Sequence, residues 1–285
     1  MAEKIINDAI HGSFRVDGVR KELLQTPEFN KLSHIKQLGL AHLVFPGAHH
    51  TRFEHSLGVS HVGGMMADSV GLDEEEKCLV QVAGMLHDVG HGPYSHTLEH
   101  ILHENGGMDH MSVTEGIIMG DHDVLRQGEA SVFAKRMLVP DILEKYDIDP
   151  KRVSDLIRGP DASGSERSLF WSEGENNFSD EDHTLATLVH GPVDCDQTDY
   201  LLRDAHFTGV RHGIIDHRHL IHNLHRHAGS VAIDESGIPA LEGMLTARAL
   251  MYSAVYFHRV TRITEVMLSS AVERMNVDDY DPLDM

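Results

Sequence analysis

The chain has 285 residues, of which 41% are hydrophobic and 24% are charged, as in an ordinary water-soluble globular protein with a substantial core. Aspartate and glutamate outnumber lysine and arginine by 45 to 24, and the formal net charge of −21 argues against strong non-specific binding to nucleic acid. A small anionic substrate remains compatible with this charge, because a few cations focused in a cleft can override the net field.

Cysteine and hydropathy patterns bear on where the protein works. Cys78 and Cys195 are the only cysteines, so there is no disulfide framework. The first residues, MAEKIINDAI, lack the pattern of a signal peptide, and there is no run of about 18 apolar residues. We therefore expect a cytoplasmic protein with no membrane association. The unusual count is 24 histidines, which indicates metal or proton chemistry.

Most of the chain has the pattern of helices. In GLDEEEKCLVQVAGMLHD, Asp73 and Glu76 have the spacing of a capping box, and an apolar stripe with helical spacing follows until the DVGHGP segment breaks it. Similar patterns predict helices over residues 52–67, 95–104, 110–119, 139–147, 183–189, 194–205 and 217–225, and one long helix over 241–274.

Strand signals are few, so we predict a mainly α fold with one or two short β-hairpins. SVAIDESGIPAL alternates around a turn at 234–237, and GSFRVDG near the start is a second candidate strand. Residues 159–183 are rich in glycine, serine and acidic residues, which predicts a mobile loop or an insertion. Its Phe170 and Trp171 favour a local anchor over a substrate contact.

The densest group of chemistry-bearing residues is MLHDVGHGPYSHTLEH, residues 85–100. His87 and Asp88 are adjacent, so both can reach one ion only near a helix end, where the glycines place them; His91 follows one helical turn later. Imidazole with carboxylate suits a divalent ion such as Fe, Mn, Zn, Co or Ni. A lone His-Asp pair is a weak signal, and two other segments strengthen it.

The first of these segments is HTRFEHSLG, where Arg52 and His55 share one helical face. A cation beside a metal ligand is what a bound phosphate requires. The alternative is that Arg52 pairs with a surface acid such as Glu54.

The second segment is DCDQTDYLLRDAHFTG, with one polar helical face that either faces solvent or surrounds a ligand: Asp196, Asp199, Tyr200, Arg203 and Asp204. The last helix has a comparable stripe, which either binds phosphate and stacks on a base or packs with its phenol groups in water: Arg248, Tyr252, Tyr256 and Arg259.

These motifs, PGAHHTRFEHSLGV, LHDVGHGPYSH, DCDQTDYLLRD and YFHR, occur in an order that resembles the HD-domain phosphohydrolases. INDAIHGSFRV and TPEFNKLSHIKQLG are similar to the branch containing the dNTP triphosphohydrolases of the sterile-alpha-motif and HD-domain type. The resemblance runs from about residue 6 to 268. It implies a single HD-domain helical bundle over residues 1–285, with the HD motifs within 50–205.

The resemblance also implies a mononuclear site for a divalent transition metal or Mg, with the ligands His55, His87, Asp88 and Asp196. Two imidazoles and two carboxylates leave positions open for water and a phosphate oxygen, as a catalytic site requires. A histidine–acid relay falls on His91 and Glu99, with His110 nearby, and His96 is the candidate general acid. Glu99 stands where the dNTP-cleaving relative has aspartate.

Substrate contacts implied by the resemblance surround the phosphates, the sugar and the base: Gln37, Leu38, Arg52, Tyr200, Asp204, Arg248, Tyr256 and His258. Gln37 and Leu38 are similar to the pair that screens the sugar against a 2′-hydroxyl. Gln197 is a departure, because a basic residue that touches triphosphate usually follows the metal-binding aspartate. This departure argues for weaker triphosphate binding or for another phosphate ester.

The resemblance implies hydrolysis of deoxynucleoside triphosphates to deoxynucleoside and triphosphate. One alternative is a hydrolase of another nucleotide or small phosphate ester, such as a monophosphate or a cyclic dinucleotide, and another is a non-catalytic nucleotide sensor. Relatives form symmetric oligomers, so we expect a homo-oligomer, a dimer or tetramer. We expect the C-terminal lobe of the relatives to be absent or truncated, because the chain ends just past the last helix.

Overall fold

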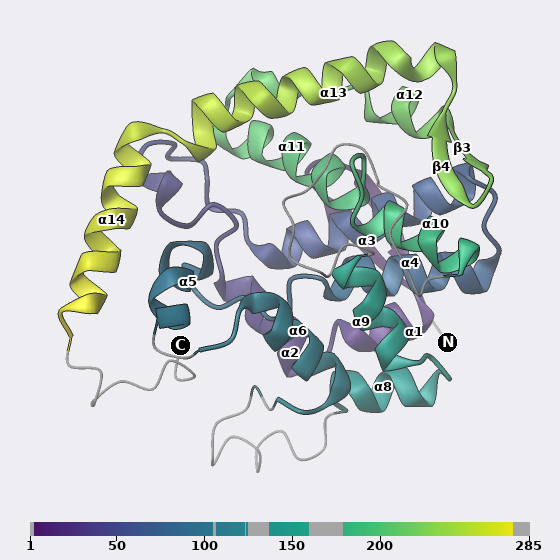
Figure 1. Ribbon diagram of the computed structural model, residues 1–285, viewed down its shortest axis with the longest axis horizontal. Coiled ribbons are helices and arrows are strands. Elements are labelled where there is room, and N and C mark those ends of the chain that lie inside the picture. Colours follow the sequence, from purple (N-terminus) through teal and green to yellow (C-terminus); the bar gives the residue numbers. More distant parts are fainter. Residues whose placement is uncertain (1–2, 105–106, 123, 125–136, 160–178, 276–285) are drawn as a thin grey trace.

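The computed structural model describes residues 3–104, 107–122, 124, 137–159 and 179–275 (Figure 1). Helices dominate these residues, and their strands form two separate two-stranded antiparallel sheets, which confirms the predicted mainly α class. Residues 160–178, with Phe170 and Trp171, lie outside the described residues, so the predicted loop stays a prediction.

The N-terminal hairpin joins β1 (Lys4–Asp8) to β2 (Gly12–Val16), which confirms the strand predicted in GSFRVDG. Gly12 at the turn has a φ of +73°, a conformation that glycine adopts without strain. Short helices follow: α1 (Gly18–Leu23), α2 (Pro27–Asn30), η1 (Lys31–His34) and η2 (Gly39–Leu43).

Two helices form the centre of the molecule, α3 (Arg52–Ser69) and α4 (Glu74–Leu86), and α11 (Cys195–Thr208) packs against α3. The predicted capping box is confirmed: the Asp73 carboxylate accepts from the Glu76 amide, and Glu76 accepts from the Asp73 amide. A Cβ on Gly84 would lie 3.1 Å from a methyl carbon of Val59, so glycine permits close packing of α3 and α4.

Among the described residues, six further helices surround this centre: α5 (Ser95–Glu104), α6 (His110–Met119), α8 (Val139–Lys145), α9 (Pro150–Arg158), α10 (Asp180–Val189) and α12 (His217–His222). They agree with the predicted helices, except that α9 was not predicted. Apolar side chains from most of these elements and from α3 and α4 form one buried core. A second core lies under α13 (Ile238–Met251), where it meets α11 and α12.

The second hairpin begins earlier in the chain than predicted. It pairs β3 (Leu224–His227) with β4 (Ser230–Ile233), and Ala228 and Gly229 form the turn with positive φ. The predicted turn at 234–237 is wrong, because Glu235–Gly237 forms the 3-10 helix η4 instead. The short 3-10 helix η3 (Arg211–Gly213) precedes α12.

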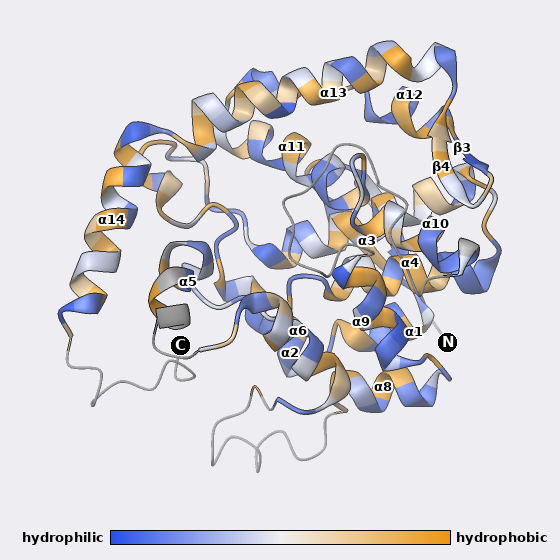
Figure 2. Ribbon diagram, in the orientation of Figure 1, coloured by the Kyte–Doolittle hydropathy of each residue, from blue (hydrophilic) through white to orange (hydrophobic). Residues whose placement is uncertain are grey.

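The predicted long helix over 241–274 is also wrong. The chain leaves α13 through a π-helical turn, η5 (Tyr252–Tyr256), and starts α14 (Arg259–Glu273) after His258, whose ψ of 126° is not helical. A π turn inserts an extra residue and redirects the axis. Figure 1 shows α14 turning away from α13 toward α5, and Figure 2 shows hydrophobic and hydrophilic bands alternating along both helices.

Among the residues that the structure describes, none of the helices combines the length and apolar character needed to cross a bilayer.

Candidate metal centre and adjoining cavity

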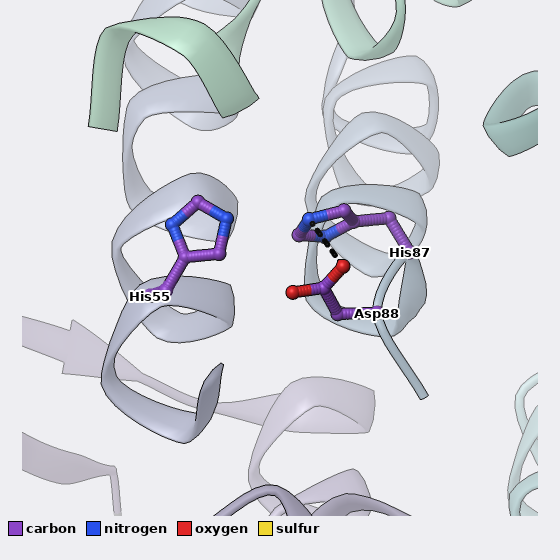
Figure 3. A group of neighbouring side chains, drawn as sticks. All are labelled: His55, His87 and Asp88. Atoms are coloured by element: carbon purple, nitrogen blue, oxygen red, sulfur yellow. Dashed lines mark ion pairs between the residues drawn. The ribbon is translucent and has the colours of Figure 1, made fainter. Parts of the chain in front are cut away.

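The side chains of His55, His87 and Asp88 converge between α3 and the end of α4 (Figure 3). One potential ligand atom from each lies within 4.8 Å of the others. His87 is the C-cap of α4, so the chain leaves the helix there and both His87 and Asp88 can face His55. His87 Nδ1 lies 2.8 Å from the Gly84 carbonyl oxygen, which leaves its Nε2 for a ligand.

Asp196, in the first turn of α11, joins this group from the opposite side. Its Oδ1 lies 3.0 Å from His55 Nε2 and 3.7 Å from His87 Nε2. The structure thus brings together the two imidazoles and two carboxylates predicted as ligands, a donor set that suits a divalent cation.

The other ring nitrogen of His55 contacts a carboxylate outside the predicted ligand set, that of Asp199. Asp199 Oδ2 lies 2.8 Å from His55 Nδ1, and Asp199 also contacts Arg203 and the His11 Nε2. Asp199 is fully buried, and its carboxylate lies where a side chain on Gly58 of α3 would stand. This carboxylate holds Nε2 of His55 toward Asp196, as in the carboxylate–histidine–metal arrangement.

The charges at His55 favour a cation. Burial lowers the pKa of His55, but hydrogen bonds to Asp196 and Asp199 outweigh burial and raise it to about 10. These two carboxylates therefore favour a positive charge between them, from a proton or from a metal ion. Since Asp199, Arg203 and Asp204 are all buried, the alternative of a solvated polar face for α11 is wrong.

Arg52, at the start of α3, pairs with Asp88 rather than with Glu54. Arg52 Nη1 donates to Asp88 Oδ2 at 2.7 Å, while Glu54 forms the capping contacts with Thr51. Burial raises the pKa of Asp88, but Arg52 and the neighbouring histidines hold it well below its usual range. The Arg52 Nε is buried with no hydrogen-bond partner, so it can donate to an anion.

Three histidines and Glu99 lie beside the cluster of His55, His87, Asp88 and Asp196. The rings of His91 and His110 stack with centroids 4.2 Å apart, and those of His91 and His96 are 4.9 Å apart. The expected Glu99–His91 contact is wrong: Glu99 Oε1 lies 2.7 Å from His110 Nδ1, while His91 Nδ1 lies 2.6 Å from the Ser95 hydroxyl. The structure therefore pairs Glu99 with His110, and the His110 ring stacks on that of His91.

A cavity of about 500 Å³ opens beside this cluster. Arg52 and His96 line this cavity. Five other predicted substrate contacts line it as well, together with the neighbouring Tyr252: Gln37, Leu38, Tyr200, Asp204 and Tyr256. One carboxylate orders this wall, since Asp204 accepts from the Tyr256 hydroxyl at 2.7 Å. The other oxygen of Asp204 lies 2.8 Å from His50 Nε2, a partner that the sequence reading missed.

Three residues singled out in the sequence lie elsewhere. Arg248 and His258 are not among the described residues that line the cavity; the Arg248 guanidinium lies 5.9 Å from the Tyr252 ring centre, and His258 stands edge-on to Phe45. Gln197 is buried, and its amide donates to the Gly191 carbonyl and to Asp194. Gln197 therefore supports the start of α11, and its side chain does not reach the cavity.

Comparisons with known proteins agree with the position of this cluster. A family model of the HD domain matches residues 52–137, which include His55, His87 and Asp88, and a model of an HD associated region matches residues 215–283. The chain is 34% identical over 278 residues to the uncharacterized protein YwfO of Bacillus subtilis, covering 95% of this chain and 56% of YwfO.

The relatives include a protein with a named activity. The chain is 28% identical over 307 residues to deoxynucleoside triphosphate triphosphohydrolase SAMHD1 of Homo sapiens, covering 97% of this chain and 45% of SAMHD1. It is 32% identical to a phosphohydrolase from Bacteroides thetaiotaomicron whose crystal structure superimposes with a TM-score of 0.69, covering 94% of this chain and 58% of that one. The chain spans about half the length of the curated relatives it matches.

Proposed function

This chain belongs to the HD-domain phosphohydrolase superfamily, and we propose that it is a metal-dependent phosphohydrolase that converts deoxynucleoside triphosphates to deoxynucleoside and triphosphate. The observation that carries this proposal is the cavity of about 500 Å³, whose wall joins Arg52 and His96 at the His/Asp cluster to the Tyr256–Asp204 pair. A phosphate group and a sugar can thus be held in one continuous space.

The proposed metal ligands are His55, His87, Asp88 and Asp196. A divalent ion held by them supplies Lewis-acid polarisation of a phosphate ester. Arg52 stabilises the charge that develops on the phosphate oxygens, because its Nε is buried and has no other partner. Water attacks the phosphorus atom that bears the nucleoside, the bond to the 5′ oxygen breaks, and triphosphate leaves intact.

Two histidines handle protons in this reaction. His91 accepts the proton of the attacking water; it is deprotonated at neutral pH because burial and the nearby Arg52 hold its pKa well below the usual range. His110, held by Glu99, stacks on the His91 ring and restrains its orientation. His96 lines the cavity. Burial and Arg52 lower its pKa, but the negative charge of the bound phosphates favours its protonated form, which donates a proton to the departing 5′ oxygen.

The sugar is the proposed point of selection. Gln37 and Leu38 line the cavity with Tyr200 and Asp204, and the Gln37 Oε1 is buried with no hydrogen-bond partner. A sugar hydroxyl can donate to this oxygen and to Asp204. We propose that Leu38 lies against the 2′ carbon and excludes ribonucleotides.

The test is a product analysis with protein that has been stripped of metal and reloaded with one ion at a time, from Mn, Fe, Co, Ni, Zn and Mg. Intact triphosphate released from a deoxynucleoside triphosphate supports the proposal. Orthophosphate released from a nucleoside monophosphate, or cleavage of a cyclic dinucleotide, supports another phosphoesterase of the same superfamily. Nucleotide binding without cleavage under every ion identifies a nucleotide sensor.

We further propose that the protein is a cytoplasmic homo-oligomer. Apolar side chains along α13 and α14 are exposed, and such a surface is typical of an interface between subunits.

A further inference from the structure

One end of the cavity has no role in the chemistry proposed above. Thr261, Arg262 and Glu265 of α14 form this end, together with Phe257 from the bend between η5 and α14. α14 packs against η2 and α5, and Figure 1 shows it well apart from α3. The turn at 257–258 that divides the predicted long helix is what brings these side chains to the cavity.

Thr261 indicates that a polar ligand atom belongs at this end. Thr261 lines the cavity and is only 3% exposed, and its Oγ1 has no hydrogen-bond partner. A buried hydroxyl without a partner destabilises the folded protein, so such groups are rare unless a ligand or water completes them. Gln37 also lines the cavity, and its Oε1 is likewise buried without a hydrogen-bond partner.

Beside Thr261 stands an ion pair that presents a donor and an acceptor together. Arg262 Nη1 donates to Glu265 Oε2 at 2.7 Å, and the Glu265 side chain is only 18% exposed. The Arg262 guanidinium also lies 5.9 Å from the Phe257 ring centre, which restrains it. This pairing uses one carboxylate oxygen and one guanidinium nitrogen, so the remaining atoms are available to a ligand that carries adjacent acceptors and donors.

We propose that Thr261, Arg262 and Glu265 bind the base of the nucleotide and select guanine. This inference rests on the proposed function, since it takes the cavity to be the nucleotide site. Guanine offers acceptors at O6 and N7, which arginine recognises, and donors at N1 and N2, which a carboxylate accepts. Adenine has no donor at N1 and an amino group at position 6, so it would place an acceptor toward Glu265 and a donor toward Arg262.

The test uses nucleosides that have no phosphate, so that the result is independent of cleavage. Binding of 2′-deoxyguanosine, 2′-deoxyadenosine, 2′-deoxyinosine and 2′-deoxycytidine to the full chain is measured by titration calorimetry. We expect 2′-deoxyguanosine to bind about tenfold or more tightly than 2′-deoxyadenosine, because a site built to pair polar groups rejects a ligand that leaves them unpaired. 2′-Deoxyinosine, which lacks the 2-amino group, is expected to lie between them.

Three variants assign the preference to residues. Glu265→Gln is expected to bring 2′-deoxyguanosine to within about twofold of 2′-deoxyadenosine, and Thr261→Val to weaken binding of 2′-deoxyguanosine. Glu242→Gln makes the same chemical change at an exposed position of α13 and is expected to bind as the wild type does. Circular dichroism checks that each variant is folded, and the 2′-deoxyinosine comparison needs no variant.

Equal affinity of the wild type for the four nucleosides, or no binding of any, overturns the inference, as does an unchanged preference in folded Glu265→Gln. The proposed function fails separately, if intact triphosphate is not released by any metal-loaded form. A protein that selects 2′-deoxyguanosine but does not release triphosphate would support base selection and contradict the proposed reaction.

Discussion

At the scale of the residue, the proposed metal ligand His55 is oriented by a buried carboxylate. Its Nδ1 faces Asp199 at 2.8 Å and its Nε2 faces Asp196 at 3.0 Å. We predict that Asp199→Asn lowers metal affinity by about 10- to 100-fold, because an amide no longer fixes the ring tautomer by accepting a charged hydrogen bond. Competition with a chelator measures this affinity, and unchanged affinity in a folded variant would remove Asp199 from the site.

The adjacent pair His87 and Asp88 allows a more direct test of the metal site. We predict that His87→Ala combined with Asp88→Ala loses both bound metal and turnover, since half of the proposed ligands are removed. Elemental analysis of the purified variant measures the metal content. His212→Ala, a change at an exposed histidine, is the control and should keep its metal. Stoichiometric metal in the double variant would show that the ion binds elsewhere.

Glu99 tests the proton path apart from the metal. Its carboxylate lies 2.7 Å from His110 Nδ1, and it is not among the proposed ligands. We predict that Glu99→Gln keeps stoichiometric metal and slows hydrolysis by about 100-fold, the lower end of what a positioned proton-transfer group contributes. Steady-state kinetics with metal analysis of the same sample checks this. Glu75→Gln, on the exposed start of α4, serves as control, and wild-type turnover in Glu99→Gln would exclude the path.

Local spacing predicted only part of this site. The adjacency of His87 and Asp88, and the placement of Arg52 and His55 on one face of α3, could be read from the sequence. The partners that orient the site could not, because Asp199 lies 144 residues after His55 and 188 residues after His11. Their contacts depend on how α11 packs against α3, and no local periodicity encodes that packing.

At the scale of the element, the β1–β2 hairpin is tied to the helical core by a histidine with an unusual pKa. The His61 ring of α3 stacks on Phe14 of β2 with centroids 4.4 Å apart. Burial and the neighbouring His11 and Arg20 lower the pKa of His61 from 6.5 to about 4. The unfolded chain therefore binds this proton more tightly than the folded protein does.

The sign of the pH effect follows from that difference. The stability that neutral His61 contributes is fully present above pH 6.5 and is lost as the pH falls from 6.5 to about 4. We predict that the melting temperature falls across this interval, and that it falls less steeply in His61→Phe, which keeps the ring stack and cannot be protonated. Thermal melts at several pH values compare the two proteins; parallel curves would contradict the prediction.

The elements themselves were predictable where amphipathic periodicity and caps agree, as in α4, whose capping box is present. The two errors arise where the backbone changes direction, at Ala228 and at the π turn Tyr252–Tyr256. The β3–β4 hairpin packs on α3 and α10, and α14 packs on α5 and η2. These positions depend on tertiary contacts, so the local pattern alone does not locate them.

At the scale of the whole molecule, the net charge of −21 opposes association of identical chains, because like-charged surfaces repel. A homo-oligomer must therefore be held by apolar contact. The α14 surface can provide it, since Val260, Ile263, Val266 and Met267 are 47%, 48%, 61% and 65% exposed. Val260, Ile263 and Met267 recur at spacings of three and four residues, and Val266 lies three residues after Ile263, so all four fall on one stripe of the helix.

We predict that Val266→Glu combined with Met267→Glu converts an oligomer to a smaller species, because the change adds charge to the apolar stripe and to an already anionic protein. Light scattering after size-exclusion chromatography gives the mass of each species. Thr246→Glu, which adds one charge at an exposed polar position of α13, is the control. Raising the salt concentration should favour the wild-type oligomer, since ions screen the repulsion between exposed charges but leave apolar contact intact. A wild type that is monomeric at every salt concentration, or a double variant with the wild-type mass, would show that α14 is not the interface.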